Sequence, residues 1–99
     1  MIVIAGHFRV PGGVTADFEP AVKAYVAAVR AEPGCREFTF AYDAVDPEII
    51  RAFEIYTDRA AFEAHTQSPH LTEWKATRAR MGVSERVIKL YEVSSVEVV

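Results

Sequence analysis

The chain has 99 residues, of which 51% are hydrophobic and 25% charged, a composition typical of one folded domain over residues 1–99 rather than of a disordered segment. Its net charge of −3 at pH 7, without any Lys- or Arg-rich run, argues against nucleic acid or a membrane surface as a partner. No apolar stretch approaches the roughly 20 residues of a membrane-spanning helix. The N-terminus lacks the basic region of a signal peptide, and the single cysteine cannot form an internal disulfide, so we expect a cytoplasmic protein.

The first segments predict a strand followed by an amphipathic helix. Residues 2–10 are mostly β-branched and aromatic with apolar groups on both parities, which favours a strand, and the Pro-Gly-Gly of residues 11–13 ends it. From about residue 15 to residue 31, apolar residues recur at steps of three and four. Pro20 is tolerated only near the first turn of a helix, so the regular helix should begin at or just after Asp17.

The middle of the chain predicts a hairpin. Residues 32–34, Glu-Pro-Gly, stop the helix, because a residue before proline avoids helical geometry and glycine accepts a left-handed turn. Residues 36–43 alternate between aromatic and other side chains, residues 46–48 carry turn-forming Asp and Pro, and residues 49–57 alternate again. Two antiparallel strands joined by a turn are therefore expected.

The following segment predicts a helix that is interrupted once. Asp58 is placed to cap a short helix, and Ser68 followed by Pro69 is the typical start of a second one, which Gly82 should end after about Met81. The interruption lies just after His65. A broken helix is suited to forming a pocket wall with this imidazole near the break.

Residues 86–93 read as the fourth strand, and residues 94–99 as an extended tail. The order βαββαβ predicts an α+β, ferredoxin-like fold with a four-stranded antiparallel sheet and both helices on one face. Because the strands carry apolar groups on both parities, the other face should also be buried, and in so short a chain a second copy must bury it. The sequence therefore predicts a homodimer.

A set of residues spread over nearly the whole chain forms a recognisable pattern: Glu32, Pro33, Gly34, Cys35, Phe38, Asp46, Pro47, Glu54, Tyr56, Asp58, Ala61, Phe62, His65, Ser68, Pro69 and His70. With these residues the chain resembles the antibiotic biosynthesis monooxygenase (ABM) family, small proteins that include cofactor-free quinol monooxygenases and relatives acting on signalling molecules. The resemblance implies a dimeric α/β barrel with one pocket per subunit between sheet and helices.

His65 is the leading candidate for chemistry, because an imidazole changes charge near neutral pH and can remove a proton from a phenol or enol. The alternative is a histidine at a helix end that hydrogen-bonds a backbone carbonyl. His70, in the restarted helix, is expected to have a local role at or near the surface.

His7 lies on the minority parity of the first strand, where the resemblance places a pocket-facing side chain, and it could donate a hydrogen bond to a substrate oxygen. The alternative is a histidine at the dimer seam or the sheet edge. Glu54 is a carboxylate in an otherwise apolar strand and needs a partner. Either an arginine (Arg36, Arg51 or Arg86) pairs with it as structural support, or Glu54 orients His65.

An aromatic and aliphatic cavity is expected around these groups, although such residues at strand or helix spacing are more often core. The candidate substrate-binding residues are Tyr56, Phe62, Trp74, Phe38, Phe40 and Leu71.

The sequence carries no motif for a metal, haem or nucleotide cofactor. His65 and His70 are five apart across a proline, whereas zinc pairs on one helix are spaced by four, and no carboxylate or cysteine stands at ligand spacing nearby. Haem-degrading relatives place an iron-binding histidine further along, where this chain has none in residues 73–76. Ser68 is explained as a helix cap, and Cys35 has no histidine beside it in the sequence, so no nucleophile is indicated. We expect no metal and no cofactor.

The resemblance implies a monooxygenase that oxidises a small aromatic or enolic substrate with dioxygen, through deprotonation, one-electron reduction of dioxygen and collapse of a hydroperoxide. Two alternatives stay open at this point. The same base could serve a cofactor-free isomerase or hydratase of a keto or enol compound, or the protein could be a dimeric small-molecule-binding or stress-response module without catalysis.

Overall fold

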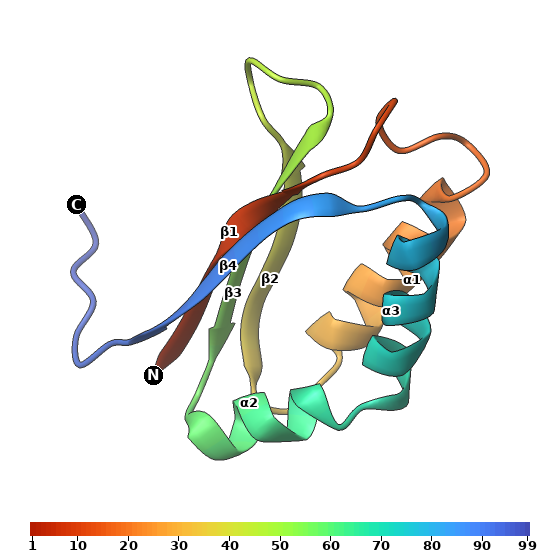
Figure 1. Cartoon of the computed structure of the whole chain (residues 1–99). Coiled ribbons are helices and arrows are strands. Elements are labelled where there is room, and N and C mark those ends of the chain that lie inside the picture. Colours follow the sequence, from red (N-terminus) through yellow and green to blue (C-terminus); the bar gives the residue numbers. More distant parts are fainter.

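The computed structural model describes all of residues 1–99 and has three helices packed on one face of a four-stranded antiparallel sheet (Figure 1). This is the predicted α+β, ferredoxin-like arrangement, with the second helix in two pieces. None of the helices has the length and apolar character needed to cross a membrane. The elements are β1 (Ile2–Arg9), α1 (Glu19–Arg30), β2 (Cys35–Tyr42), β3 (Ile49–Tyr56), α2 (Arg59–Thr66), α3 (Pro69–Arg80) and β4 (Ser84–Glu92).

The sheet has the order β2-β3-β1-β4, so β1 lies in the interior and β4 forms an edge. Ile4 of β1 is opposite Glu54 of β3 and Leu90 of β4, which places these three side chains on one face. The same face carries the buried side chains of Phe8 and Phe38, which pack against the helices. The face that receives the helices therefore contains the core and also the carboxylate of Glu54.

Side-chain caps produce the break between α2 and α3, as predicted. The Asp58 carboxylate accepts a hydrogen bond from the backbone N–H of Ala61 at 2.8 Å, which caps α2. The Ser68 hydroxyl accepts one from the Leu71 N–H at 3.3 Å and donates one to the His65 carbonyl at 2.7 Å. Each cap satisfies backbone groups that the break would leave unpaired, and such caps typically contribute about 1 kcal/mol. The break is thus specified locally, directly beside His65.

Two glycines fix the surroundings of α2 and α3. A Cβ on Gly34, in the turn between α1 and β2, would lie 2.3 Å from the Cβ of Ala61, so only glycine lets the turn approach α2 this closely. Gly82, which follows α3, has a φ of 73°, the left-handed conformation expected of a helix stop. The approach at Gly34 is what brings the turn after α1 next to the end of α2.

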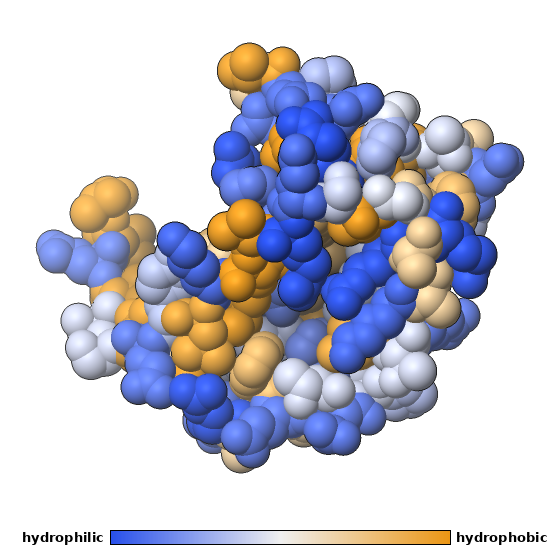
Figure 2. Space-filling view, viewed as in Figure 1, coloured by the Kyte–Doolittle hydropathy of each residue, from blue (hydrophilic) through white to orange (hydrophobic).

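The other face of the sheet and the β4 edge are open in the single chain. Phe53, Val87 and Tyr91 lie on this face and are 41%, 48% and 48% exposed, and in β4 only Ile88 is partly buried. Figure 2 shows hydrophobic side chains gathered over the sheet side of the molecule and along the C-terminal tail. The tail after β4 has no regular secondary structure and runs away from the body (Figure 1). Strand β4 begins at Ser84, slightly before the predicted start at residue 86.

Candidate functional site

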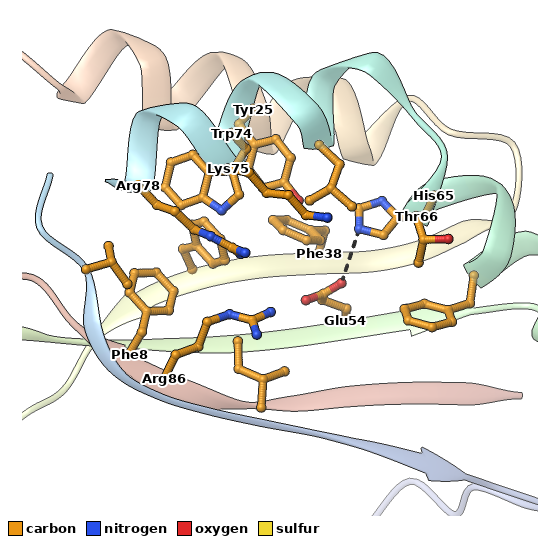
Figure 3. A pocket seen from close by; sticks show the side chains of 15 residues that line it. Phe8, Tyr25, Phe38, Glu54, His65, Thr66, Trp74, Lys75, Arg78 and Arg86 are labelled. Atoms are coloured by element: carbon orange, nitrogen blue, oxygen red, sulfur yellow. Dashed lines mark ion pairs between the residues drawn. The ribbon is translucent and has the colours of Figure 1, made fainter. Parts of the chain in front are cut away.

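A cavity of about 290 Å³ lies between the helix-facing side of the sheet and the helices (Figure 3). It contains an imidazole, a carboxylate and cationic groups among aromatic walls. The residues that line it are Phe8, Tyr25, Phe38, Phe40, Glu54, Phe62, His65, Thr66, Leu71, Trp74, Lys75, Arg78, Val83, Arg86 and Ile88.

His65, in the last turn of α2, is only 5% exposed and engages a different carboxylate near each ring nitrogen. Its Nδ1 lies 2.9 Å from Oε2 of Glu32, and its Nε2 lies 4.0 Å from Oε1 of Glu54 across the cavity (Figure 3). An ionised Glu32 accepts a hydrogen bond, so we assign the proton of neutral His65 to Nδ1. The Nε2 lone pair then faces the cavity, where it can accept a proton from a bound molecule.

Glu32 is a site residue that sequence reasoning missed. It lies in the turn after α1, and its Oε2 is also 2.5 Å from Nε2 of His70. One carboxylate oxygen thus joins both histidines, which gives His70 its local role. Glu32 was part of the family resemblance, but its sequence separation from His65 gave no sign that the two meet.

Glu54 is buried, and its partner differs from the arginine expected. The hydroxyl of Tyr56 donates a hydrogen bond to Glu54 Oε1 at 2.6 Å, and no arginine forms an ion pair with Glu54. Burial raises the pKa of the Glu54 carboxyl, while the Tyr56 hydrogen bond and the nearby charges of His65 and Arg86 oppose this rise. Arg51 points to the opposite face of β3, where its Nε lies 3.0 Å from Asp43 Oδ1.

Tyr56, predicted from the sequence among the substrate-binding residues, does not line the cavity. Its side chain is fully buried beneath Glu54, and both burial and the charge of Glu54 raise the pKa of its phenol. Tyr56 therefore acts as a neutral hydrogen-bond donor that supports Glu54.

The other expected aromatic and aliphatic residues all line the cavity. Trp74 stacks on Tyr25 with a centroid separation of 4.8 Å and an interplanar angle of 4°, and the ring of Phe40 lies 5.6 Å from Trp74. These rings belong to the core and to the cavity wall at once. The remaining expected residues in the wall are Phe38, Phe62 and Leu71.

His7, predicted from the sequence as a possible pocket-facing donor, does not line the cavity. Side chains alternate along a strand, and the neighbouring Phe8 is in the core, so His7 faces the open side of the sheet. There it lies in register with Arg51 and Val87.

Three cationic side chains line the cavity: Lys75 and Arg78 of α3 and Arg86 of β4. From the sequence, Arg86 was considered only as a possible partner of Glu54, and the other two were not singled out. Arg78 is one helical turn after Trp74, and Arg86 has the same strand parity as Ile88, which also lines the cavity. These spacings were available in the sequence, but they become informative only once Trp74 and Ile88 are known to face the cavity.

A second cavity of about 300 Å³ lies beyond Trp74, Phe8 and Phe40, which line both cavities. No histidine lines it, and its charged residues, Glu19 and Lys23, form an ion pair with each other at 2.7 Å. The first cavity combines aromatic walls with a buried imidazole and a buried carboxylate, His65 and Glu54, so we take it as the candidate site.

Glu32, His65 and His70 could together hold a divalent metal, because one ligand atom from each lies within 4.8 Å of the others. From the sequence, only ligand spacing along the chain was considered, and Glu32 comes from a distant turn, so this group was not visible from spacing alone. In the structure these atoms are joined by hydrogen bonds through Glu32. A metal here would occupy Nδ1 of His65 and leave Nε2 facing the cavity.

The sequence model of the antibiotic biosynthesis monooxygenase family matches residues 1–77. The chain therefore belongs to this family. An uncharacterized protein of Synechocystis sp. is 26% identical over 96 residues, which cover 97% of this chain and 65% of that protein. A protein of Mycobacterium tuberculosis, described as a putative monooxygenase, is 36% identical over 53 residues, which cover 54% of this chain and 52% of that protein. This chain thus spans less than two thirds of the length of either relative.

Solved structures give the same fold. The structure of a putative antibiotic biosynthesis monooxygenase from Deinococcus radiodurans superposes with a TM-score of 0.81 at 18% sequence identity. The match covers 100% of this chain and 98% of that protein's chain. A conserved protein from Methanosarcina mazei superposes with a TM-score of 0.80 at 21% identity and covers 94% of this chain and 92% of its own. At these sequence identities the likeness establishes the fold only, and the chemistry has to be argued from the residues of the site.

Proposed function

We propose that this protein is a cofactor-independent monooxygenase that oxidises a small electron-rich phenol, hydroquinone or enol with dioxygen. One observation carries the proposal: a buried imidazole is held by a carboxylate at Nδ1 and presents Nε2 to an aromatic cavity. Membership of the ABM family supports an oxidation as the reaction. The chain's own groups supply a base and an aromatic cavity, which is sufficient when the substrate provides the electrons.

In the proposed reaction, Nε2 of His65 removes a proton from the substrate. The resulting anion gives one electron to dioxygen, and the substrate radical and superoxide combine at a ring carbon that retains a hydrogen. The peroxide anion takes the proton back from His65, and loss of water from the hydroperoxide leaves a carbonyl. One oxygen atom enters the product and the other enters water, and the substrate supplies all four electrons.

The position of His65 relative to Glu54 favours one alternative, the isomerisation of a keto or enol compound. Their facing atoms are 4.0 Å apart, and burial raises the pKa of Glu54. Two groups that can exchange protons and face each other across a cavity could move hydrogen between two positions of a substrate without oxygen.

Oxygen consumption separates these reactions. Purified protein with menadiol or 1-naphthol should consume dioxygen above the uncatalysed rate, and product formation should stop under strict anaerobiosis. His65→Gln should lower turnover about 100-fold, the scale of general base catalysis. His7→Gln is the matched control, because it removes an imidazole from the opposite face of the sheet. Turnover that persists without oxygen would establish the isomerase reading instead.

The proposed enzyme needs no metal at Glu32, His65 and His70. Turnover should therefore be unchanged after treatment with a chelator. A loss of activity that added Zn²⁺ or Mn²⁺ restores would show that this group of ligands holds a required metal.

We also propose that the protein acts as a homodimer in the cytoplasm, on small molecules only. The exposed apolar sheet face and the nine-residue edge strand β4 support a second copy as the partner. The single cysteine, Cys35, is compatible with a reducing compartment.

A further inference from the structure

Arg78 and Arg86 line the candidate site without a carboxylate partner of their own. Arg78 comes from α3 and Arg86 from β4, and Figure 3 shows both guanidinium groups reaching into the cavity from opposite walls. Neither side chain forms an ion pair or a hydrogen bond within the protein, and the carboxylate whose charge Arg86 influences, Glu54, is hydrogen-bonded to Tyr56 instead. Other arginines, such as Arg9, Arg51 and Arg59, are paired with Asp or Glu.

Two neighbouring cations at an aromatic wall are unfavourable until an anion joins them. Burial and the charge of Arg86 both lower the pKa of Arg78. Each guanidinium offers a planar set of N–H donors that matches the oxygens of a carboxylate or a phosphate. An anionic group between them would remove the repulsion and use donors that the protein leaves free.

The cations and the proposed base occupy different parts of the cavity. In Figure 3, Arg78 and Arg86 lie toward the Phe8 end, whereas His65 and Thr66 lie at the other end, with the rings of Trp74, Tyr25 and Phe38 between them. An aromatic molecule lying along these rings could place an acidic substituent at the arginines and a hydroxyl or enol near His65.

We propose that the substrate of this pocket is an aromatic or enolic anion whose carboxylate or phosphate binds between Arg78 and Arg86. This inference rests on the proposed function, because the bound anion is a substrate only if the protein is an enzyme. The anion site itself can be tested by binding alone. The alternative is that water molecules, rather than a ligand anion, occupy the donors of both guanidinium groups.

Trp74 is the single tryptophan of the chain and lines the cavity, so its fluorescence reports binding without any turnover. The probes are 2-naphthoate, 2-naphthyl phosphate and the neutral 2-naphthylmethanol, titrated at neutral pH. We expect at least one of the two anions to bind about tenfold or more tightly than the alcohol, the scale of one charge-assisted hydrogen bond. Comparing the two anions decides between carboxylate and phosphate.

Arg78→Gln and Arg86→Gln should each weaken binding of the preferred anion about tenfold and leave binding of the alcohol unchanged. Arg80→Gln is the matched control, because Arg80 lies on the same helix but does not line the cavity. Equal affinity for the alcohol and both anions, or anion binding that is indifferent to both cavity variants, would overturn the proposal.

Turnover then separates this inference from the proposed function. The substrates are 1,4-dihydroxynaphthalene and its 2-carboxylate, compared through oxygen consumption. A lower KM for the carboxylate that Arg78→Gln abolishes supports both proposals. Selective anion binding without oxygen use for either compound keeps the anion site and rejects the oxidation, whereas equal oxidation of both compounds with equal KM rejects the anion site and keeps the oxidation.

Discussion

Glu32 and His65 stand 33 residues apart in the sequence, yet Oε2 of the first lies 2.9 Å from Nδ1 of the second. The contact joins the turn after α1 to the last turn of α2. It leaves the other ring nitrogen, Nε2, free to face the cavity. The carboxylate thus acts on the substrate only through His65, as a positioning residue.

Glu32→Gln should lower kcat about tenfold or more, because a neutral amide no longer fixes the Nδ1 proton or stabilises the imidazolium formed during catalysis. The affinity for 2-naphthoate, read from Trp74 fluorescence, should not change, since Glu32 does not line the cavity. Steady-state oxygen consumption and the fluorescence titration together make this measurement.

His70→Gln is the control for that substitution. It removes the second hydrogen bond to Glu32 Oε2 while the contact with His65 can remain. We expect a much smaller loss of kcat than for Glu32→Gln. Equal losses in the two variants would mean that the whole hydrogen-bonded group, rather than the pair with His65, supports activity.

Glu54 should make the folded protein less stable as pH rises. Because burial raises the pKa of Glu54 above its ordinary value of 4.5, the native state holds this proton more tightly than the unfolded state does. The free energy of unfolding therefore loses this contribution as pH rises from about 4.5 through the folded pKa. Glu54→Gln keeps an oxygen that accepts the hydrogen bond of the Tyr56 hydroxyl but does not titrate. The variant therefore lacks this pH-dependent loss, and its free energy of unfolding relative to that of the natural protein should increase with pH.

Urea unfolding of both proteins from pH 4 to pH 8 measures this difference. Asp43 and Asp46, whose pKa values are lowered mainly by backbone hydrogen bonds, give the opposite trend, but they are present in both proteins and cancel. Glu63→Gln, an exposed carboxylate change on α2, should leave the pH dependence as it is. A difference that shrinks toward alkaline pH would mean that Glu54 is stabilised as the anion.

Local chemistry made most of the fold predictable. Pro20 in the first turn of α1, the caps Asp58 and Ser68, and Gly82 after α3 each specify a helix boundary by groups within a few residues. Strand alternation likewise gave the hairpin and the face of Phe38. These features depend on backbone geometry and neighbours, so one sequence is sufficient to find them.

The site was predictable only where it depends on the same local rules. His65 and Trp74 were found because the broken helix orients them. Glu32 was missed because it reaches the site from another element, and Arg86 was considered only as a partner of Glu54. The face of His7 was open because it depends on which strand parity the helices cover. Packing between distant elements decides which residues reach the site and which strand face the helices cover. A single sequence does not show this packing directly.

Gly34→Ala should destabilise the protein by about 1–3 kcal/mol, the usual cost of overpacking. The added methyl group would lie 2.3 Å from the Cβ of Ala61, so α2 must move away from the turn that carries Glu32. Because His65 lies on α2, kcat should fall as well. Denaturant unfolding and oxygen consumption report the two effects.

A double-mutant cycle isolates the clash. Ala61→Gly removes the opposing methyl group at the ordinary cost of a glycine within a helix, about 0.5–1 kcal/mol. Gly34→Ala with Ala61→Gly should then be more stable than the sum of the two single changes predicts. If the changes in the free energy of unfolding were strictly additive, the destabilisation by Gly34→Ala would arise within the turn itself and not from contact with Ala61.

Light scattering at micromolar concentration should give a mass of about twice the 11.0 kDa chain. The open sheet face carries Phe53, which is 41% exposed in the single chain, and a charge there would meet its counterpart across the proposed interface. Phe53→Glu should therefore shift the protein to monomer while adding little cost to the isolated chain. Val45→Glu makes the same chemical change at the tip of the β2–β3 hairpin, where the residue is 91% exposed, and should leave the dimer intact. A natural protein that is monomeric at this concentration, or a Phe53→Glu variant that stays dimeric, would show that the sheet face is not where two copies meet.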